Sequence, residues 1–564
     1  MDTKQSIVDL VTISYEKGIR KVVFSSGSRN APLIIAFNEF GKFDTYSIHD
    51  ERSAAFFALG MAQQTGETVA IACTSGSAVL NYAPAIAEAY YQRIPLLVIT
   101  ADRPLEWIDQ GEGQTMRQAD IYNNFIKHSF EIFQETNHPD ELWYNNRMFN
   151  EAINLTQIAP LGPVHINIPL REPLYENDFR FSDSNTKIIN HISPLPSLSE
   201  EALDTLANIW NDSKKKLILT GILPKTHGLK ELLRQISDDP SVIVITETTS
   251  NINAPGFINN IDRFIMSIRN EQNEEFKPDL LLTLGSNIVS KKIKSLIRKW
   301  NPAEHWDIDE SDKIVDTYKS LTKHIKSEIN SFLRGMIKRK KESKSNFKSI
   351  YLLQESEVHS KHEIFLKDAP WSDLKAYSII MSNLPKEVNL QMANSTAVRY
   401  AQLMDSRHDI IYNSNRGVAG IDGCTSTAAG ASLSQNKMTV LVTGDVAFLY
   451  DSNALWNNYL QGNLKIIVFN NEGGNIFRFI PGPAKTKQLE EFFEAHHSIK
   501  VEQIAKAFDI NYFSAINEKE LIDQLPKFFE NQSNDRPCLI EIFTPRKENM
   551  NILNNYFKAI LKPL

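Results

Sequence analysis

The chain has 564 residues, of which 42% are apolar and 23% charged, with a formal net charge of −7. This is the composition of a globular protein with about three or four domains, and its acidic balance gives no reason to expect nucleic acid or an anionic membrane as partner. No apolar run approaches the roughly 20 residues that span a bilayer, and the N-terminus has no leader pattern. We therefore expect a cytoplasmic protein without a membrane span.

Residues 1–182 alternate the patterns of strands and helices, with small-residue turns between them. Apolar segments typical of buried strands lie at 21–24, 46–49, 68–73 and 95–100, and helices are expected over 7–15, 51–66 and 77–89. Asp50 is placed to cap the helix that begins at Glu51. Strand, turn and helix in repetition predict a doubly wound parallel sheet.

A second alternating unit follows a polar linker around residues 182–186. Strands are predicted at 216–220, 242–246, 280–284 and 305–308, and a GxGxxG dinucleotide motif is missing from this region. We expect a central structural α/β domain over residues 190–335. Residues 336–374, which include a basic run at 338–341, are expected to form a solvated connector.

Residues 375–564 form a third alternating unit. Strands are predicted at 388–393, 409–412, 439–443, 464–469 and 538–543, a glycine-rich loop at 414–423, and a helical tail from Glu548. The fold class predicted for the whole chain is therefore α/β, with three doubly wound parallel-sheet domains.

Two polar side chains follow neighbouring apolar segments of this third unit. Asp445 comes directly after the strand at 439–443, and Asn471 after the strand at 464–469. In a parallel sheet with a helical crossover these strand ends lie side by side at the ligand-binding edge. A carboxylate and an amide oxygen there are suitable ligands for Mg²⁺ bound to a diphosphate. Acidic and Asn residues are also common in ordinary turns, so a βαβ unit without a metal remains open.

A set of short motifs narrows the interpretation. In chain order they are 27–29 with 31–33, 50–52, 74–76, 100–104, Gln114 with Arg117 and Gln118, 394–396 with Arg399, 414–417 through 420–423, and 475–477. Together they resemble the thiamine diphosphate-dependent decarboxylase superfamily. Within it, they are similar to the synthases that make 2-succinyl-5-enolpyruvyl-6-hydroxy-3-cyclohexene-1-carboxylate (SEPHCHC) in menaquinone biosynthesis. The resemblance covers the two outer domains well and the middle domain weakly.

The resemblance implies an activity, cofactors and partners. It implies a transferase that decarboxylates 2-oxoglutarate and adds the succinyl carbanion to isochorismate, with thiamine diphosphate and Mg²⁺ or Mn²⁺ as cofactors. It implies a pyrimidine-binding domain over 1–182 and a diphosphate-binding domain over 375–564. It also implies a homodimer or homotetramer, because in this superfamily each site lies between two subunits.

The resemblance also implies roles for individual residues. Glu51 is the catalytic residue, since a carboxylate beside the far ring nitrogen of the cofactor favours the tautomer that activates it. The metal ligands are Asp445, Asn471 and the carbonyl of Gly473. The cofactor-binding set is Glu51, Thr74, Ser75, Gly76, Ser414, Gly417, Ile421, Gly444, Asp445, Val446, Asn471, Gly473 and Gly474. The substrate-binding set is Ser28, Arg29, Arg103, Gln114, Lys291, Ser395, Arg399, Arg416, Ile476 and Phe477.

Simpler explanations of these residues stay open. Glu51 alone is a favourable residue for the first turn of any helix, and each Arg alone is commonly a surface ion-pair partner. A related enzyme, such as an acetolactate synthase or another 2-oxoacid decarboxylase, is the nearest alternative. A nucleotide-binding regulator without catalysis is an alternative of another class.

Overall fold

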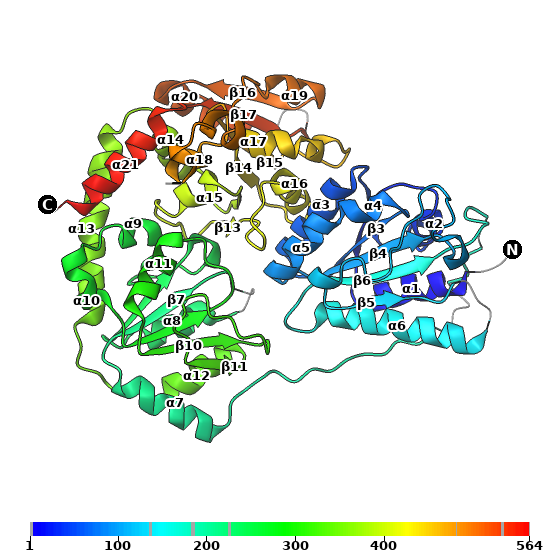
Figure 1. Cartoon of the computed structure of the whole chain (residues 1–564), viewed down its shortest axis with the longest axis horizontal. Coiled ribbons are helices and arrows are strands. Elements are labelled where there is room, and N and C mark those ends of the chain that lie inside the picture. Colours follow the sequence, from blue (N-terminus) through cyan, green and yellow to red (C-terminus); the bar gives the residue numbers. More distant parts are fainter. Residues whose placement is uncertain are drawn as a thin grey trace.

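The computed structural model describes residues 4–134, 138–176, 178–181, 186–223, 227–480, 482–531 and 535–562. Three parallel sheets follow one another along the chain, each covered by helices (Figure 1). This confirms the predicted α/β class with three parallel-sheet domains. Residues 182–185 of the predicted linker lie outside the described residues, and residues 186–199 run without helix or strand to the middle domain.

The first sheet has six strands in the order β2-β1-β3-β4-β6-β5. Its central strands are apolar and buried on both faces, as parallel sheets between two helical layers require. The strands are β1 Lys21–Phe24, β2 Asp44–Ser47, β3 Val69–Cys73, β4 Leu96–Asp102, β5 Ser129–Glu131 and β6 Val164–Pro169. The helices are α1 Gln5–Glu16, α2 Ala31–Glu39, α3 Glu51–Thr65, α4 Ser77–Asn81, α5 Ala83–Gln92 and α6 Pro139–Gln157.

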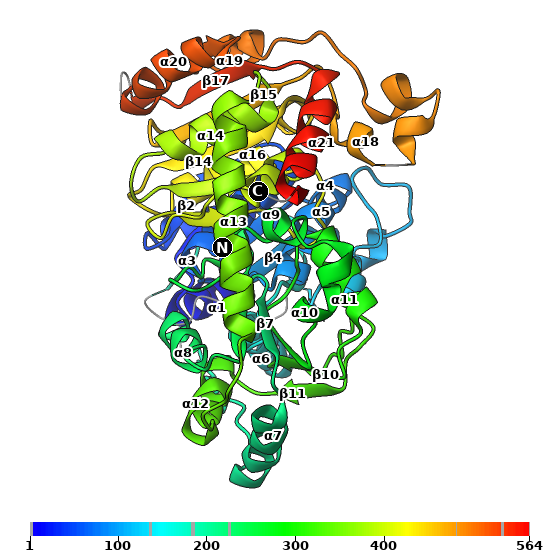
Figure 2. The same ribbon diagram turned by 90° about the vertical axis from the view of Figure 1, so that its left-hand side faces the viewer.

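The middle sheet has five strands in the order β11-β10-β9-β7-β8. The strands are β7 Lys216–Thr220, β8 Val242–Thr246, β9 Leu280–Leu284, β10 Glu304–Asp309 and β11 Lys323–Lys326. The helices are α7 Glu200–Asp212, α8 Leu229–Ile236, α9 Ile261–Ile265, α10 Asn273–Phe276, α11 Lys291–Trp300 and α12 Ile329–Arg339. The predicted connector contains the long helix α13, Phe347–Asp368, which runs beside both the middle and the last domain (Figure 2).

The last sheet has the order β13-β12-β14-β15-β17-β16, which repeats the pattern of the first sheet. The strands are β12 Asn389–Met392, β13 Ile411–Asn413, β14 Thr439–Gly444, β15 Leu464–Asn470, β16 Asn511–Ala515 and β17 Cys538–Phe543. The helices are α14 Asp373–Asn383, α15 Thr396–Ala401, α16 Cys424–Ser432, α17 Asp445–Tyr450, α18 Ile476–Phe479, α19 Glu502–Ala507, α20 Glu518–Glu530 and α21 Glu548–Leu561.

Several predicted elements differ from the structure for local reasons. The second strand covers Asp44–Ser47 and not 46–49; it is an edge strand with a polar, partly exposed sequence. The helix predicted over 77–89 is split into α4 and α5, because Pro84 stands in the first turn of α5 and cannot continue a helix from α4. The strands β5, β6, β11 and β16 were not predicted.

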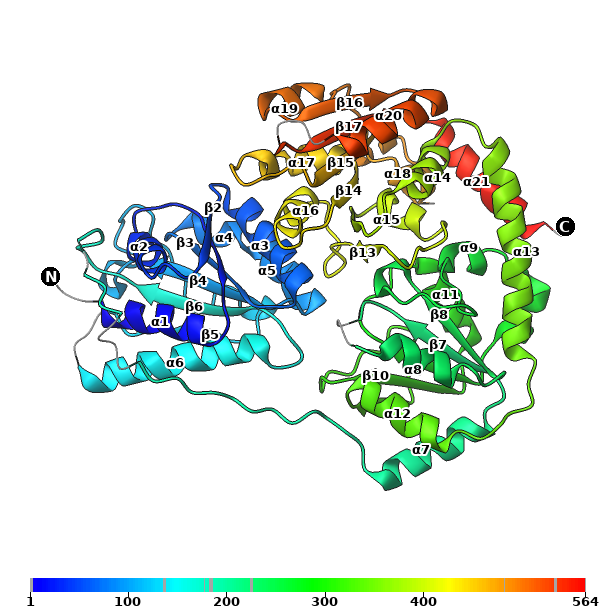
Figure 3. The ribbon, with the colours of Figure 1, turned by 180° about the vertical axis from the view of Figure 1, so that it is seen from behind.

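The first and last domains of the chain pack directly against each other through α3 and α16 (Figure 3). The crossing is close because glycines lie at the contact. A Cβ atom on Gly430 would lie 1.9 Å from the Phe57 carbonyl oxygen, and one on Gly60 would lie 2.0 Å from the Thr427 carbonyl oxygen. Only glycine is compatible with this backbone approach. Among the described helices, none combines the length and apolar composition needed to cross a bilayer.

Candidate active site

The ends of β14 and β15 lie side by side, as the sequence predicts. Thr443 pairs with Val468 and Gly444 with Phe469, so Asp445 and Asn471 follow adjacent strands at the same edge. Both side chains are buried, with exposed fractions of 2% and 4%. The Asp445 carboxylate accepts hydrogen bonds from the backbone N–H groups of Val446 at 2.7 Å and Gly473 at 3.0 Å.

The Asn471 side chain is held with its oxygen free. Its Nδ2 donates to Oδ2 of Asp373 at 3.0 Å, while its Oδ1 is buried and has no hydrogen-bond partner among the described residues. A buried acceptor without a donor is costly, and an unfilled amide oxygen beside a carboxylate fits a hard cation such as Mg²⁺. A Cβ atom on Gly444 would have no atom within 4 Å, so space opens beside this pair. The residues therefore fit a metal bound to a phosphate group.

Asp373 and His497 contact this pair, although sequence reasoning missed them. Burial raises the pKa of Asp373 to about 6, against the hydrogen bonds that it accepts from Thr544, Asn471 and Asn549. His497 lies with Nε2 3.4 Å from Oδ2 of Asp445, and the hydrogen bond to that carboxylate raises the pKa of His497. No spacing or motif in the sequence marks either residue, because both contacts join segments far apart in the chain.

The loop after Asn471 has an unusual backbone. Gly473 has a φ of +146°, and a Cβ atom there would lie 2.7 Å from the Glu494 carbonyl oxygen. The carbonyl of Gly473 accepts from the N–H of Asn475 at 2.9 Å. Gly474 donates its N–H to the Glu494 carbonyl at 2.6 Å. Ile476 and Phe477 begin α18 and are partly buried, and the Phe477 ring lies 5.7 Å from that of Phe493.

Two cations of the last domain lie close together near the same edge. Arg399 is on α15, after β12, which pairs with β14. It donates to the carbonyl of Ser395, whose φ is +75°. Arg416 in the glycine-rich loop donates to Oδ1 of Asn394 at 2.7 Å. Burial lowers the pKa of both arginines, and the nearby Arg399 lowers that of Arg416 further. Two desolvated like charges mark a site for an anion.

Four further residues of the predicted cofactor-binding set lie in the glycine-rich loop and just after β14. Ser414 is buried, and its hydroxyl has no partner among the described residues. Gly417 and Ile421 lie in the same loop, with Ile421 partly buried. Val446 occupies the first turn of α17 and donates its N–H to Asp445.

A second group of assigned residues meets at the carboxyl edge of the first sheet. The Ser75 hydroxyl donates to the Gln114 carbonyl at 2.8 Å, and Gly76 packs against the Gln114 backbone. Arg103 donates through Nη2 to the Gly113 carbonyl at 3.0 Å. Gln118 joins these parts, because its Oε1 accepts from the Gly76 N–H at 2.9 Å. The structure thus brings Ser75, Gly76, Arg103 and Gln114 together.

Arg29 lies next to this turn but is buried within its own domain. Its backbone N–H donates to the Thr74 hydroxyl at 3.3 Å, and its Nη1 donates to the Leu170 carbonyl at 2.9 Å. Its Nη2 lies 3.3 Å from Oε1 of Glu172. The neighbouring Ser28 is exposed.

Glu51 occupies the first position of α3 and is half-buried. Its Oε2 accepts a hydrogen bond from Nδ2 of Asn81, in the same domain, at 3.1 Å. The residues on either side contact the last domain: Asp50 accepts from Asn453 at 2.7 Å, and Arg52 donates to the Tyr450 carbonyl at 2.9 Å. Asp50 also accepts from the Ser53 N–H, which confirms the predicted cap. The carboxylate of Glu51 is therefore held by its own domain.

The middle domain supplies two lysines at the start of α11. Lys291 is exposed, whereas Lys292 is partly buried with its Nζ 3.4 Å from the centre of the Phe557 ring. Burial lowers the pKa of Lys292 to about 8. Lys292 thus packs against the C-terminal helix α21, and Lys291 remains the available cation at this position.

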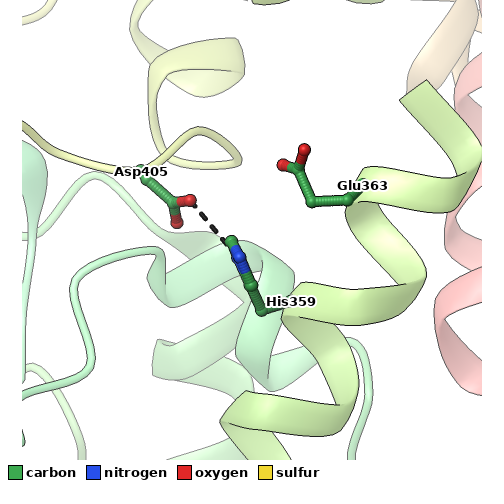
Figure 4. Close-up of side chains that lie close together, drawn as sticks. All are labelled: His359, Glu363 and Asp405. Atoms are coloured by element: carbon green, nitrogen blue, oxygen red, sulfur yellow. Dashed lines mark ion pairs between the residues drawn. The ribbon is translucent and has the colours of Figure 1, made fainter. Parts of the chain in front are cut away.

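A separate group of potential metal ligands is explained by ion pairing. His359, Glu363 and Asp405 bring one ligand atom each to within 4.8 Å of one another, and all three are exposed (Figure 4). Asp405 is already paired, with Oδ2 3.3 Å from Nδ1 of His359 and Oδ1 2.6 Å from Nη2 of Arg263. This cluster links α13 and the middle domain to the last domain.

Comparisons with known proteins match each of the three domains. Residues 1–121 match the N-terminal thiamine pyrophosphate (TPP) binding domain of thiamine pyrophosphate enzymes, residues 195–391 the middle domain, and residues 393–542 the C-terminal TPP binding domain. Three curated relatives are named 2-succinyl-5-enolpyruvyl-6-hydroxy-3-cyclohexene-1-carboxylate synthase. That of Flavobacterium psychrophilum is 44% identical over 99% of this chain and 98% of its own length. That of Flavobacterium johnsoniae is 43% identical over 99% and 98%, and that of Porphyromonas gingivalis 41% over 99% and 97%. The chain therefore belongs to the SEPHCHC synthase family of thiamine pyrophosphate enzymes.

Proposed function

We propose that this chain is the transferase that forms SEPHCHC and carbon dioxide from 2-oxoglutarate and isochorismate in menaquinone biosynthesis. The observation that carries the proposal is the buried pair Asp445 and Asn471, whose amide oxygen has no partner among the described residues, at the sheet edge near Arg399 and Arg416. The pair suits a metal diphosphate, and the arginines suit dicarboxylates. The names of the full-length relatives support the product.

The last domain would hold the diphosphate end of the cofactor. Asp445, Asn471 and the Gly473 carbonyl would hold Mg²⁺ or Mn²⁺. Gly444, Val446, Gly474, Ser414, Gly417 and Ile421 would contact the cofactor around it. Asp373 fixes the orientation of the Asn471 amide through its 3.0 Å hydrogen bond, which keeps the oxygen available as a ligand.

The first domain would hold the ring end of the cofactor. When bound, thiamine diphosphate supplies the nucleophilic carbon and the electron sink that decarboxylation of a 2-oxoacid needs. Glu51 would share a proton, at its carboxylate oxygen, with the ring nitrogen of the aminopyrimidine. The turn at Thr74, Ser75 and Gly76 would lie against the ring, since Gln118 and Gln114 already fix that turn.

The substrates explain the number of cations. 2-Oxoglutarate and isochorismate carry two carboxylates each, and Arg recognises a carboxylate with two parallel hydrogen bonds. Arg399 and Arg416 would take carboxylates at the last domain, and Arg29, Arg103 and Lys291 would act from the other two domains. Ser28, Gln114 and Ser395 would add hydrogen bonds, while Ile476 and Phe477 would form an apolar wall.

A homodimer or homotetramer would complete the site. Glu51 is bonded to Asn81 of its own domain and is half-buried, and Leu80 beside Asn81 has an exposed fraction of 50%. A carboxylate that acts on the cofactor needs a dry environment. The diphosphate domain of a second chain, packed over this surface, would supply both the cover and the cofactor.

Two observations weigh against the alternatives. An enzyme for pyruvate handles a monoanion, and the two partly buried cations Arg399 and Arg416 would exceed its need. A regulator would bind its nucleotide where the strand order reverses, between β7 and β9. The glycine-rich GxGxxG motif that would cradle a dinucleotide phosphate is missing from the sequence there.

A direct assay tests the proposal. The protein is incubated with thiamine diphosphate, Mg²⁺, 2-oxoglutarate and isochorismate, and SEPHCHC is measured by mass spectrometry. We expect SEPHCHC only when both substrates are present. Turnover of pyruvate without isochorismate coupling would support another decarboxylase. Absence of any thermal shift with thiamine diphosphate and Mg²⁺ would support a nucleotide-binding regulator without catalysis.

A further inference from the structure

A carboxylate of the first domain accepts hydrogen bonds from the backbone of the glycine-rich loop in the last domain. Glu88, on α5, has an exposed fraction of 2%. Its Oε1 accepts from the Gly417 N–H at 2.6 Å, and its Oε2 accepts from the N–H groups of Val418 at 2.7 Å and Ala419 at 3.3 Å. Three successive N–H groups that converge on one anion form the concave arrangement by which backbones bind anions. Here the anion is a side chain of another domain.

The loop is shaped around this carboxylate. A Cβ atom on Gly417 would lie 2.5 Å from the Glu88 carbonyl oxygen and 3.1 Å from Oε1 of Glu88, so only glycine allows the approach. Ala419 adopts a φ of +66°, which is unfavourable for a residue with a side chain. The hydrogen bonds to Glu88 offset this strain, and the loop conformation therefore depends on the first domain.

The same segment is anchored from the other two domains. Asn287 of the middle domain donates through Nδ2 to the Arg416 carbonyl at 2.7 Å. Asn394 of the last domain donates through Nδ2 to the carbonyls of Asn415 at 2.7 Å and Gly420 at 2.6 Å, while its Oδ1 accepts from Arg416. Arg416 thus lies between fixed points, with Glu88 holding the residues immediately after it.

We propose that Glu88 is a positioning residue that sets the direction of the Arg416 guanidinium for a substrate carboxylate. This inference rests on the proposed function, in which Arg416 binds a dicarboxylate. The Glu88 carboxylate is buried against the loop N–H groups, so it acts on Arg416 through the loop. Bidentate recognition by Arg requires the correct orientation of the guanidinium plane as well as its charge. Loss of the hydrogen bonds to Glu88 therefore weakens substrate binding more than it slows the chemical step.

The experiment compares Glu88→Gln with Gln92→Ala. Gln replaces one of the acceptor oxygens with an N–H₂ group that faces the loop N–H groups, at nearly unchanged volume. Gln92 is the matched control: it lies on the same helix and donates to Oε1 of Glu88 at 2.5 Å without contact to the loop N–H groups. Glu88→Asp, which keeps the charge but withdraws it by one methylene, provides an intermediate variant that remains useful if Glu88→Gln folds poorly.

Two readouts are measured on the full chain loaded with thiamine diphosphate and Mg²⁺. Hydrogen exchange of peptides that contain residues 417–419 measures how well the loop N–H groups are held by Glu88. We expect about tenfold faster exchange in Glu88→Gln. Steady-state kinetics report the positioning, and we expect KM for 2-oxoglutarate or isochorismate to rise about fivefold to tenfold while kcat changes less than about twofold. Glu88→Asp should fall between, and Gln92→Ala should match the parent protein in both readouts.

The outcomes separate this inference from the proposed function. Faster exchange with both KM values unchanged would overturn the positioning role, as would unchanged exchange with unchanged KM values. A fall in kcat with no change in KM would also overturn it, because a structural defect in the loop would act that way. Failure of the parent protein to form SEPHCHC would reject the proposed function, whereas the exchange result would still show whether Glu88 holds the loop.

Discussion

The first and last sheets share one strand order, but their ligand-binding edges differ. At the last sheet, Asp445 and Asn471 are buried and leave an oxygen without a partner, so one chain already provides a place for a cation. At the first sheet, Glu51 is half-buried and its carboxylate is bonded within its own domain. In the proposed function, the last domain therefore carries a complete diphosphate-binding edge, and the first domain carries an incomplete ring-binding edge with the same topology. The chemistry depends on residues at strand ends, and the fold alone does not determine it.

The largest effect is expected at the incomplete edge. Glu51→Gln should lower kcat by about 10² to 10⁴, because the neutral amide cannot share the proton that activates the ring. Binding of thiamine diphosphate, measured by calorimetry with Mg²⁺, should change little, since Glu51 contributes nothing to the metal or diphosphate. Unchanged turnover would contradict the catalytic assignment and favour a purely structural first-turn Glu.

At the edge of the last sheet, a substitution should affect cofactor binding and not turnover. Asp445→Ala removes the carboxylate of the metal pair and should weaken metal-dependent binding of thiamine diphosphate by at least about 100-fold. Calorimetric titrations with and without EDTA measure this. In the parent protein EDTA should weaken binding strongly, and in the variant it should add little. Equal EDTA sensitivity in both proteins would place the metal elsewhere.

The sequence predicts most of the framework on which these two edges lie. The strands at 216–220, 242–246, 280–284 and 538–543 match the structure residue for residue, because continuous apolar runs identify strands buried on both faces. The missed β6 is equally buried but carries His165 and Asn167, whose polarity is satisfied by a hydrogen-bond network around Thr100. That compensation is invisible without the neighbouring strand.

The sequence predicts less of the site. It places Asp445 next to Asn471, because both follow strands of one βαβ unit. It does not identify Asp373, whose contact with Asn471 spans 98 residues, or Glu88, whose contact with Gly417 spans 329 residues. Such contacts leave no spacing pattern, since they depend on how separate domains and helices pack.

A smaller effect is expected from Asp373, which orients the proposed metal ligand Asn471. Asp373→Ala leaves the Asn471 amide free to turn its nitrogen toward the cation and should weaken metal-dependent cofactor binding about tenfold. Thr544→Val is the matched control, because the Thr544 hydroxyl donates to the other oxygen of Asp373 at 2.5 Å, whereas Asn471 donates to Oδ2. A similar loss in both variants would mean that general packing of the pocket matters and the orientation of Asn471 does not.

The smallest effect on activity is expected at Asp50, although it is the neighbour of Glu51. Asp50 caps α3 through the Ser53 N–H at 3.1 Å and accepts from Asn453 of the last domain at 2.7 Å. Asp50→Ala should therefore lower stability by about 1 kcal/mol, seen as an earlier first transition in urea, and should leave kcat within about twofold. Asn453→Ala removes the contact between domains while it keeps the cap, so the difference between the two shifts gives the contribution of the cap. A loss of turnover in Asp50→Ala as large as that in Glu51→Gln would mean that the position of the helix start, and not the Glu51 carboxylate, controls activity.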